Sequence, residues 1–121
     1  MSVRSLTRAI PCGFVLVLAL APALRAHAIL IEASPAKNGI VKGPDFTIHL
    51  RFNSRIDGSR SQISLVVKES TVRTLKIDKQ ATPDVLSARA EGLKPGTYRL
   101  RWQVLAADGH ITRGEYAFEV K

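Results

Sequence analysis

Strict alternation of apolar and polar residues constrains the fold of this chain more than any other feature of its sequence. In the clearest case, between residues 96 and 104, four apolar residues occupy every second position: Tyr98, Leu100, Trp102 and Val104. A period of two places neighbouring side chains on opposite faces, as in a β-strand with one buried face. Residues 46–52 show the same alternation. The pattern predicts strands, and residues 27–121 contain no convincing helical period.

Turn-forming residues separate the alternating segments. Asn38-Gly39 and Lys94-Pro95-Gly96 are of this kind. Further strands are expected at about residues 28–33, 62–68, 72–77, 85–90 and 116–120. About seven short strands predict an all-β fold, a β-sandwich. The aromatic residues on the apolar phase are expected in its core: Tyr98, Trp102 and Phe118.

The first residues of the chain predict export. Arg4 and Arg8 precede a short apolar core at residues 14–24, and small residues follow at Ala26 and Ala28. This is the pattern of a secretory signal peptide, because spanning a bilayer takes about 20 apolar residues. An uncleaved membrane anchor is the alternative. We expect a cleaved signal peptide at residues 1–26 and one domain at residues 27–121.

The composition of the predicted domain excludes two classes of protein. Residues 27–121 contain no cysteine, so a disulfide-stabilised scaffold is excluded. They contain 15 basic and 10 acidic residues, a formal charge of +5. The basic residues are spread along the chain and form no cluster interleaved with aromatics, which argues against nucleic-acid binding.

Asp108-Gly109-His110 has two interpretations. Asp-Gly between alternating segments is one of the strongest short hairpin signals, because glycine adopts the positive φ of a tight turn. If the backbone is extended instead, Asp108 and His110 point to one side and offer an oxygen and an imidazole nitrogen to a metal ion. Spacing alone favours the turn and leaves both interpretations open.

His27 is a candidate ligand only if the signal peptide is cleaved after Ala26. Its free α-amine and ring nitrogen then form a six-membered chelate, and such a nitrogen pair suits Cu(II). Cleavage after Ala28 fits the small-x-small pattern and would remove His27. His49 lies on the polar phase of its predicted strand, so we interpret it as a surface residue.

Two groups of residues, at the start and at the end of the predicted domain, have a family-specific pattern. The first is His27-Ala28-Ile29-Leu30 with Pro35-Ala36 and Gly39, and the second is Pro95-Gly96-Thr97-Tyr98, Trp102, Val104, Asp108-Gly109-His110, Gly114, Phe118 and Val120. Together they resemble the CopC family of periplasmic copper-binding proteins, also described as copper resistance proteins. The resemblance implies a cupredoxin-like, immunoglobulin-like Greek-key β-sandwich and one Cu(II) ion bound by His27, Asp108 and His110. It also favours cleavage after Ala26.

The sequence departs from the family pattern in two places. Many relatives have Phe-Ser-x-Pro after the second strand, whereas this chain has Phe52-Asn53-Ser54-Arg55, which leaves that loop without an assigned role. Some relatives carry a methionine-rich segment for Cu(I), but the only methionine here is Met1. Because thioethers suit Cu(I) while imidazole, amine and carboxylate favour Cu(II), we expect one Cu(II) site and no separate Cu(I) site.

The resemblance implies copper buffering, delivery or resistance in the periplasm, without catalysis and with a CopD-like inner-membrane protein as partner. The sequence gives no sign of oligomerisation, so a monomer is expected. Two other functions stay open on the residues alone. One is a small histidine-brace copper oxidase, and the other is a metal-free immunoglobulin-like interaction domain in which Asp108-Gly109 is only a turn.

Overall fold

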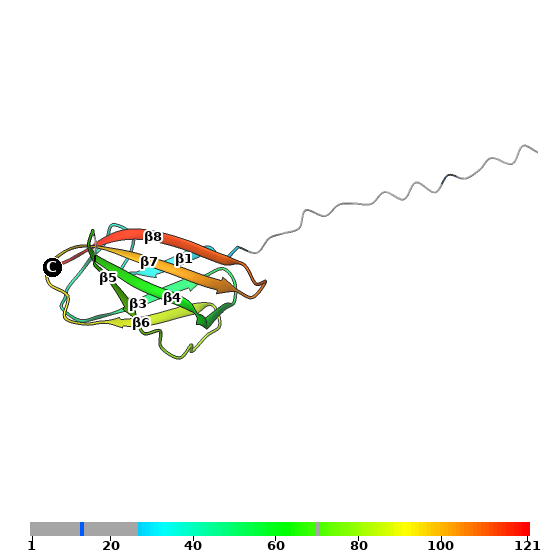
Figure 1. The fold of residues 1–121 in the computed structure, drawn as a ribbon, viewed down its shortest axis with the longest axis horizontal. Helices are drawn as coiled ribbons and strands as arrows, with labels where there is room; N and C mark the ends of the chain where they lie inside the picture. Colours follow the sequence, from blue (N-terminus) through cyan, green and yellow to red (C-terminus); the bar gives the residue numbers. More distant parts are fainter. Residues whose placement is uncertain (1–12, 14–26, 70) are drawn as a thin grey trace, which may run out of the picture.

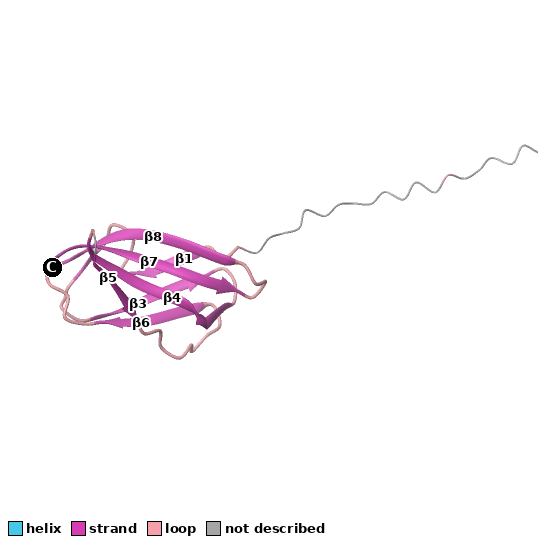
Figure 2. Cartoon of the chain, in the orientation of Figure 1, coloured by secondary structure: helices cyan, strands magenta, loops and turns pink. Residues whose placement is uncertain are grey.

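The computed structural model describes Gly13, residues 27–69 and residues 71–121, and these residues form eight β-strands and no helix (Figures 1 and 2). The predicted signal peptide lies outside the described residues, except for Gly13. In the same part of the chain, no helix has the length and hydropathy needed to cross a membrane. The strands are β1 (Leu30–Ser34), β2 (Ile40–Val41), β3 (Phe46–Phe52), β4 (Ile56–Lys68), β5 (Thr71–Leu75), β6 (Val85–Ala90), β7 (Gly96–Ala106) and β8 (Ile111–Val120).

The strands form two sheets that pack face to face. One sheet has the order β1-β3-β6, and the other has the order β2-β8-β7-β4-β5. Neighbouring strands are antiparallel except for β2 and β8, which are parallel. The chain changes sheet five times, between β1 and β2, β2 and β3, β3 and β4, β5 and β6, and β6 and β7, and such repeated crossing is typical of Greek-key sandwiches. The predicted all-β sandwich is therefore confirmed.

The alternation read from the sequence places the apolar side chains between the sheets. In β3, Phe46 and Ile48 are buried while Thr47 between them is exposed. Burying one such side chain contributes about 1.5–3 kcal/mol, and the described residues bury many of them. The largest fully buried side chains are Phe52, Phe118, Ile48, Leu50, Ile63, Leu65, Leu86, Leu93, Leu100, Val104 and Val120.

Aromatic residues of the predicted core take two positions. Tyr98 and Phe118 are buried, and their rings stack with centroids 5.9 Å apart. Trp102 is only partly buried and packs against the edge of the core. Its ring lies against Gly114 on β8, where a Cβ would overlap the indole. The core prediction is thus confirmed for Tyr98 and Phe118 and was too strong for Trp102.

Strand boundaries differ from the sequence-based expectation where alternation is weak. β2 is two residues long, too short to show a period. β4 begins at Ile56 rather than at about residue 62. The sequence does not predict this earlier start, because the polar stretch after Ile56 resembles a turn and contains a β-bulge between Asp57 and Gln62. β8 begins at Ile111 rather than at about residue 116. Its first residues alternate in exposure but not in polarity, so the sequence pattern does not reveal them.

One end of the sandwich gathers three segments that are distant in sequence. The described domain starts there, next to the turn between β7 and β8, while the C-terminus lies at the opposite end (Figure 1). The loop between β3 and β4 joins them, because Phe52 pairs with Leu30 and Ile56 pairs with Ala106. The register of the strands therefore brings the N-terminal segment and the Asp108-Gly109-His110 turn together.

Candidate metal centre

Asp108-Gly109-His110 forms the turn between β7 and β8. Gly109 has a φ of 85°, a conformation that favours glycine. Its N–H donates to the carbonyl of Ala106 at 2.9 Å, and the N–H of Ala106 donates to the carbonyl of His110 at 2.9 Å. The predicted turn is therefore confirmed, and the extended backbone that the metal-binding interpretation assumed is wrong.

The turn nevertheless brings the carboxylate of Asp108 against the imidazole of His110. Asp108 Oδ2 lies 2.9 Å from His110 Nδ1, and Oδ1 accepts a hydrogen bond from the His110 backbone N–H at 3.0 Å. These two contacts, the backbone one first, hold the pKa of Asp108 below its ordinary value, and the nearby His27 adds to the effect. The Asp108 side chain is therefore an ionised oxygen donor at neutral pH.

His27 lies beside this pair. Its ring centroid is 5.8 Å from that of His110, with an angle of 63° between the ring planes. Both imidazoles are accessible, since His27 is exposed and the side chain of His110 is 51% exposed. The structure thus brings all three predicted ligands to one surface position.

The three side chains do not enclose an ion in this conformation. Within residues 27–69 and 71–121, no three His, Cys, Asp or Glu side chains converge closely enough to hold a metal. Asp108 instead contacts Nδ1 of His110, an arrangement in which a carboxylate orients an imidazole. The backbone nitrogen of His27 becomes an amine only when the peptide bond to Ala26 is cleaved.

The loop between β3 and β4, which sequence reasoning left without a role, contacts both segments that carry these residues. Asn53 Oδ1 accepts a hydrogen bond from the Ile29 N–H at 2.8 Å, and the Asn53 N–H donates to the Ile29 carbonyl at 2.9 Å. The carbonyl of Arg55 accepts a hydrogen bond from the Ala107 N–H at 3.0 Å. An asparagine directly after a strand was the available signal, because its side chain readily bonds to a neighbouring backbone.

The third histidine is separate from this cluster. His49 lies on β3, paired with Ser34 on one side and Ser87 on the other, and is partly buried. Its position is on the outward phase of the three-stranded sheet, between the buried Ile48 and Leu50. This position agrees with the interpretation of His49 as an outward-facing residue that is not a metal ligand.

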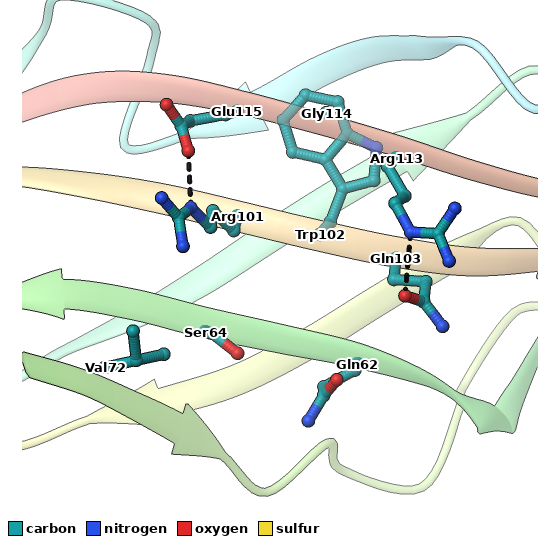
Figure 3. A pocket seen from close by; sticks show the side chains of 9 residues that line it. All are labelled: Gln62, Ser64, Val72, Arg101, Trp102, Gln103, Arg113, Gly114 and Glu115. Carbon is teal, nitrogen blue, oxygen red and sulfur yellow. Dashed lines mark hydrogen bonds and ion pairs between the residues drawn. The ribbon is translucent and has the colours of Figure 1, made fainter.

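A pocket of about 580 Å³ on the five-stranded sheet is a weaker functional candidate. Figure 3 shows the Trp102 ring extending from β7 across β8 at Gly114, with charged side chains around it. These polar groups already bond to one another: Glu115 accepts from Arg101, and Arg113 donates to Gln103 at 3.0 Å. The pocket is lined by none of the three predicted ligands. We interpret it as a surface feature of the sheet.

Comparison with known proteins identifies the family. The CopC domain model matches residues 30–121. Protein YobA of Escherichia coli (strain K12) is 35% identical over 103 residues, which cover 83% of each chain. Copper resistance protein C of Xanthomonas campestris pv. juglandis is 32% identical over 104 residues, covering 79% of this chain and 81% of that protein.

Solved structures agree with this match. CopC from Methylosinus trichosporium OB3b has a TM-score of 0.69 at 33% identity, covering 78% of this chain and 94% of that one. PcoC, a methionine-rich copper resistance protein from Escherichia coli, has a TM-score of 0.67 at 28% identity. The match covers 79% of this chain and 100% of that one. The sequence resemblance is confirmed along nearly the whole predicted domain, and the chain belongs to the CopC family.

Proposed function

We propose that the exported, signal-free protein binds one Cu(II) ion in the periplasm through His27, Asp108 and His110, and that it buffers or delivers copper or confers resistance to it. The observation that carries this proposal is the cluster at one end of the sandwich. There the imidazoles of His27 and His110 lie 5.8 Å apart, and a carboxylate contacts one of them.

The separation of the two rings supports binding of a single ion. A metal–nitrogen bond of about 2 Å places each imidazole centroid about 3 Å from the ion, so two bound rings lie about 4–6 Å apart. The observed 5.8 Å falls within this range. Both side chains are accessible enough to rotate their nitrogens toward a common point.

The donor set supports copper in its oxidised state. Cleavage after Ala26 adds the α-amine of His27 to two imidazoles and a carboxylate, and Cu(II) is the first-row divalent ion that nitrogen and oxygen donors bind most tightly. Residues 27–121 contain neither methionine nor cysteine, the soft ligands of Cu(I). This composition contrasts with PcoC, which is described as methionine-rich. The names of two relatives, copper resistance protein C and PcoC, fit a role in copper handling.

The exposure of the site supports binding and transfer rather than catalysis. His110 is half exposed and the Asp108 side chain is 28% exposed, so the ion is bound at the surface, where another protein can reach it. The proposed recipient is a CopD-like inner-membrane protein, with this protein acting as a monomer. The signal peptide at residues 1–26 is part of the proposal, because its removal creates the α-amine.

A copper titration of protein exported from a bacterial host tests the proposal. The wild type should bind one equivalent of Cu(II) in competition with a chelator of known affinity. The variant His110→Ala should lose copper to the same chelator, because it keeps only the His27 chelate and Asp108. His49→Ala is the matched control, since it removes a histidine outside the cluster and should bind as the wild type does. Equal binding by all three proteins would reject the ligand set.

A further inference from the structure

We propose that Asn53 is a positioning residue for the copper site, acting through Ile29 to hold the N-terminal histidine beside the β7–β8 turn. This inference rests on the function proposed above and adds to it a residue that does not contact the ion. It starts from the loop at residues 53–55, which bonds to the N-terminal segment on one side and to the turn on the other.

On the N-terminal side, one of the hydrogen bonds of this connection is made by a side chain, that of Asn53. β1 begins at Leu30, so His27, Ala28 and Ile29 precede the first strand. Burial of the Ala28 side chain and the two hydrogen bonds between Asn53 and Ile29 fix this segment. A chain terminus that is not fixed in this way is ordinarily poorly ordered.

The other side of the connection sets where the turn lies. The carbonyl of Arg55 accepts the N–H of Ala107, one residue before Asp108. Asn53 and Arg55 are two residues apart, so the loop holds both ligand-bearing segments at a defined separation. Because the Arg55 contact uses only the backbone, its formation does not require the arginine side chain. Among the three hydrogen bonds that join this loop to the two segments in the described part of the chain, the bond from Ile29 to Asn53 Oδ1 uses a side chain and can be removed by a substitution.

Removing this bond should affect the site more than the fold. Asn53 is exposed and is not part of the core, and exposed substitutions usually change stability little. One intramolecular hydrogen bond changes an equilibrium by about two- to tenfold. We therefore expect Asn53→Ala to weaken Cu(II) affinity by about two- to tenfold, mainly through faster release, because a terminus held by one hydrogen bond fewer leaves the ion more readily.

The experiment compares exported wild-type protein with three variants. Asn53→Ala removes the acceptor, Asn53→Asp keeps Oδ1, and Gln62→Ala is the matched control. Gln62 carries another exposed amide with one side-chain hydrogen bond, 3.5 Å long, to Thr74 on β5. The measurements are Cu(II) affinity by chelator competition, the electron paramagnetic resonance spectrum of the loaded protein, and hydrogen exchange of the Ile29 amide without copper.

The expected result is specific to Asn53→Ala. This variant should exchange the Ile29 amide faster, bind copper more weakly and show a second or broadened copper signal, while thermal unfolding of the copper-free protein changes little. Asn53→Asp should restore slow exchange and the wild-type spectrum. The exchange measurement separates the hydrogen bond from the added charge, because a nearby carboxylate can raise copper affinity without restoring protection of Ile29.

Two different failures can be distinguished. If the wild type binds copper and Asn53→Ala has the same affinity and spectrum, the positioning role is overturned while the proposed function stands. If the wild type itself binds no Cu(II), the proposed function fails, and the positioning role fails with it. Failure of Asn53→Asp to restore Ile29 protection would also overturn the role, since that variant retains the acceptor.

Discussion

Tyr116 joins the two sheets through a buried hydrogen bond, and removing its hydroxyl should change stability in a pH-dependent way. The hydroxyl donates to the carbonyl of Pro35 at 2.6 Å, which connects β8 to the segment after β1. Tyr116 is 6% exposed, and burial raises the pKa of its hydroxyl to about 12. Tyr116→Phe deletes the bond and the titrating group together while preserving the ring.

Two magnitudes follow from this geometry. At pH 7 the variant loses one hydrogen bond and leaves a carbonyl without its partner, which costs about 1–3 kcal/mol. The folded state also binds the phenolic proton more tightly than the unfolded state, where the pKa is about 10. This tighter proton binding contributes to the free energy of unfolding fully below pH 10, and the contribution is lost as pH rises toward 12. The loss is about 1.4 kcal/mol at pH 11 and at most about 2.7 kcal/mol in total.

The wild type should therefore be the more stable protein at pH 7, and its advantage should shrink by about 1.4 kcal/mol by pH 11. The assay is urea unfolding of both proteins from pH 7 to pH 11, followed by fluorescence of Trp102. Lysine titration is common to both proteins and cancels in the comparison. Tyr98→Phe is a matched variant at pH 7, since its hydroxyl donates at 2.6 Å to the carbonyl of Lys94. A difference between wild type and Tyr116→Phe that is constant from pH 8 to pH 11 would refute the reasoning.

Three further predictions concern the sheet and the site. Gly114→Ala should destabilise the fold by about 1–3 kcal/mol in thermal unfolding, because the new Cβ overlaps the Trp102 ring, and an unchanged melting temperature would contradict this. Asp108→Asn should weaken Cu(II) binding by about 10- to 100-fold in a chelator competition, since it removes the charge beside His110, and undiminished affinity would show that the carboxylate does not serve the site. Copper affinity should fall between pH 7.5 and pH 5, because protons compete for the imidazoles and for the α-amine of His27, and a flat profile would argue against nitrogen ligation.

Alternation predicts strands well where one face is buried along the whole strand. β3 and β7 were located from their sequences for this reason, since polar and buried residues alternate along most of their length. The first half of β4 was missed because its polar stretch after Ile56 includes Asp57, Gly58 and Ser59, which also form turns. That stretch is a bulged part of the strand, and only pairing with β7 defines it.

The candidate site shows a different limit. The sequence posed a choice between a turn and a pair of ligands at Asp108-Gly109-His110, but the turn itself places the carboxylate against the imidazole. Local spacing does not reveal this, because it depends on how the turn closes. Contact with His27 depends on register across the sandwich, as does the contact of Asn53 with Ile29. The prediction that His27 lies near this turn came from the family resemblance and could not have come from periodicity.

The proposed copper site depends on cleavage after Ala26, which would give His27 its free α-amine. The most direct test is the native mass spectrum of protein exported from a bacterial host and incubated with one equivalent of Cu(II). We expect a chain that begins at His27 and carries one copper ion. A chain that begins at Ile29 and carries no copper would contradict it, because the α-amine chelate and the first imidazole would both be missing.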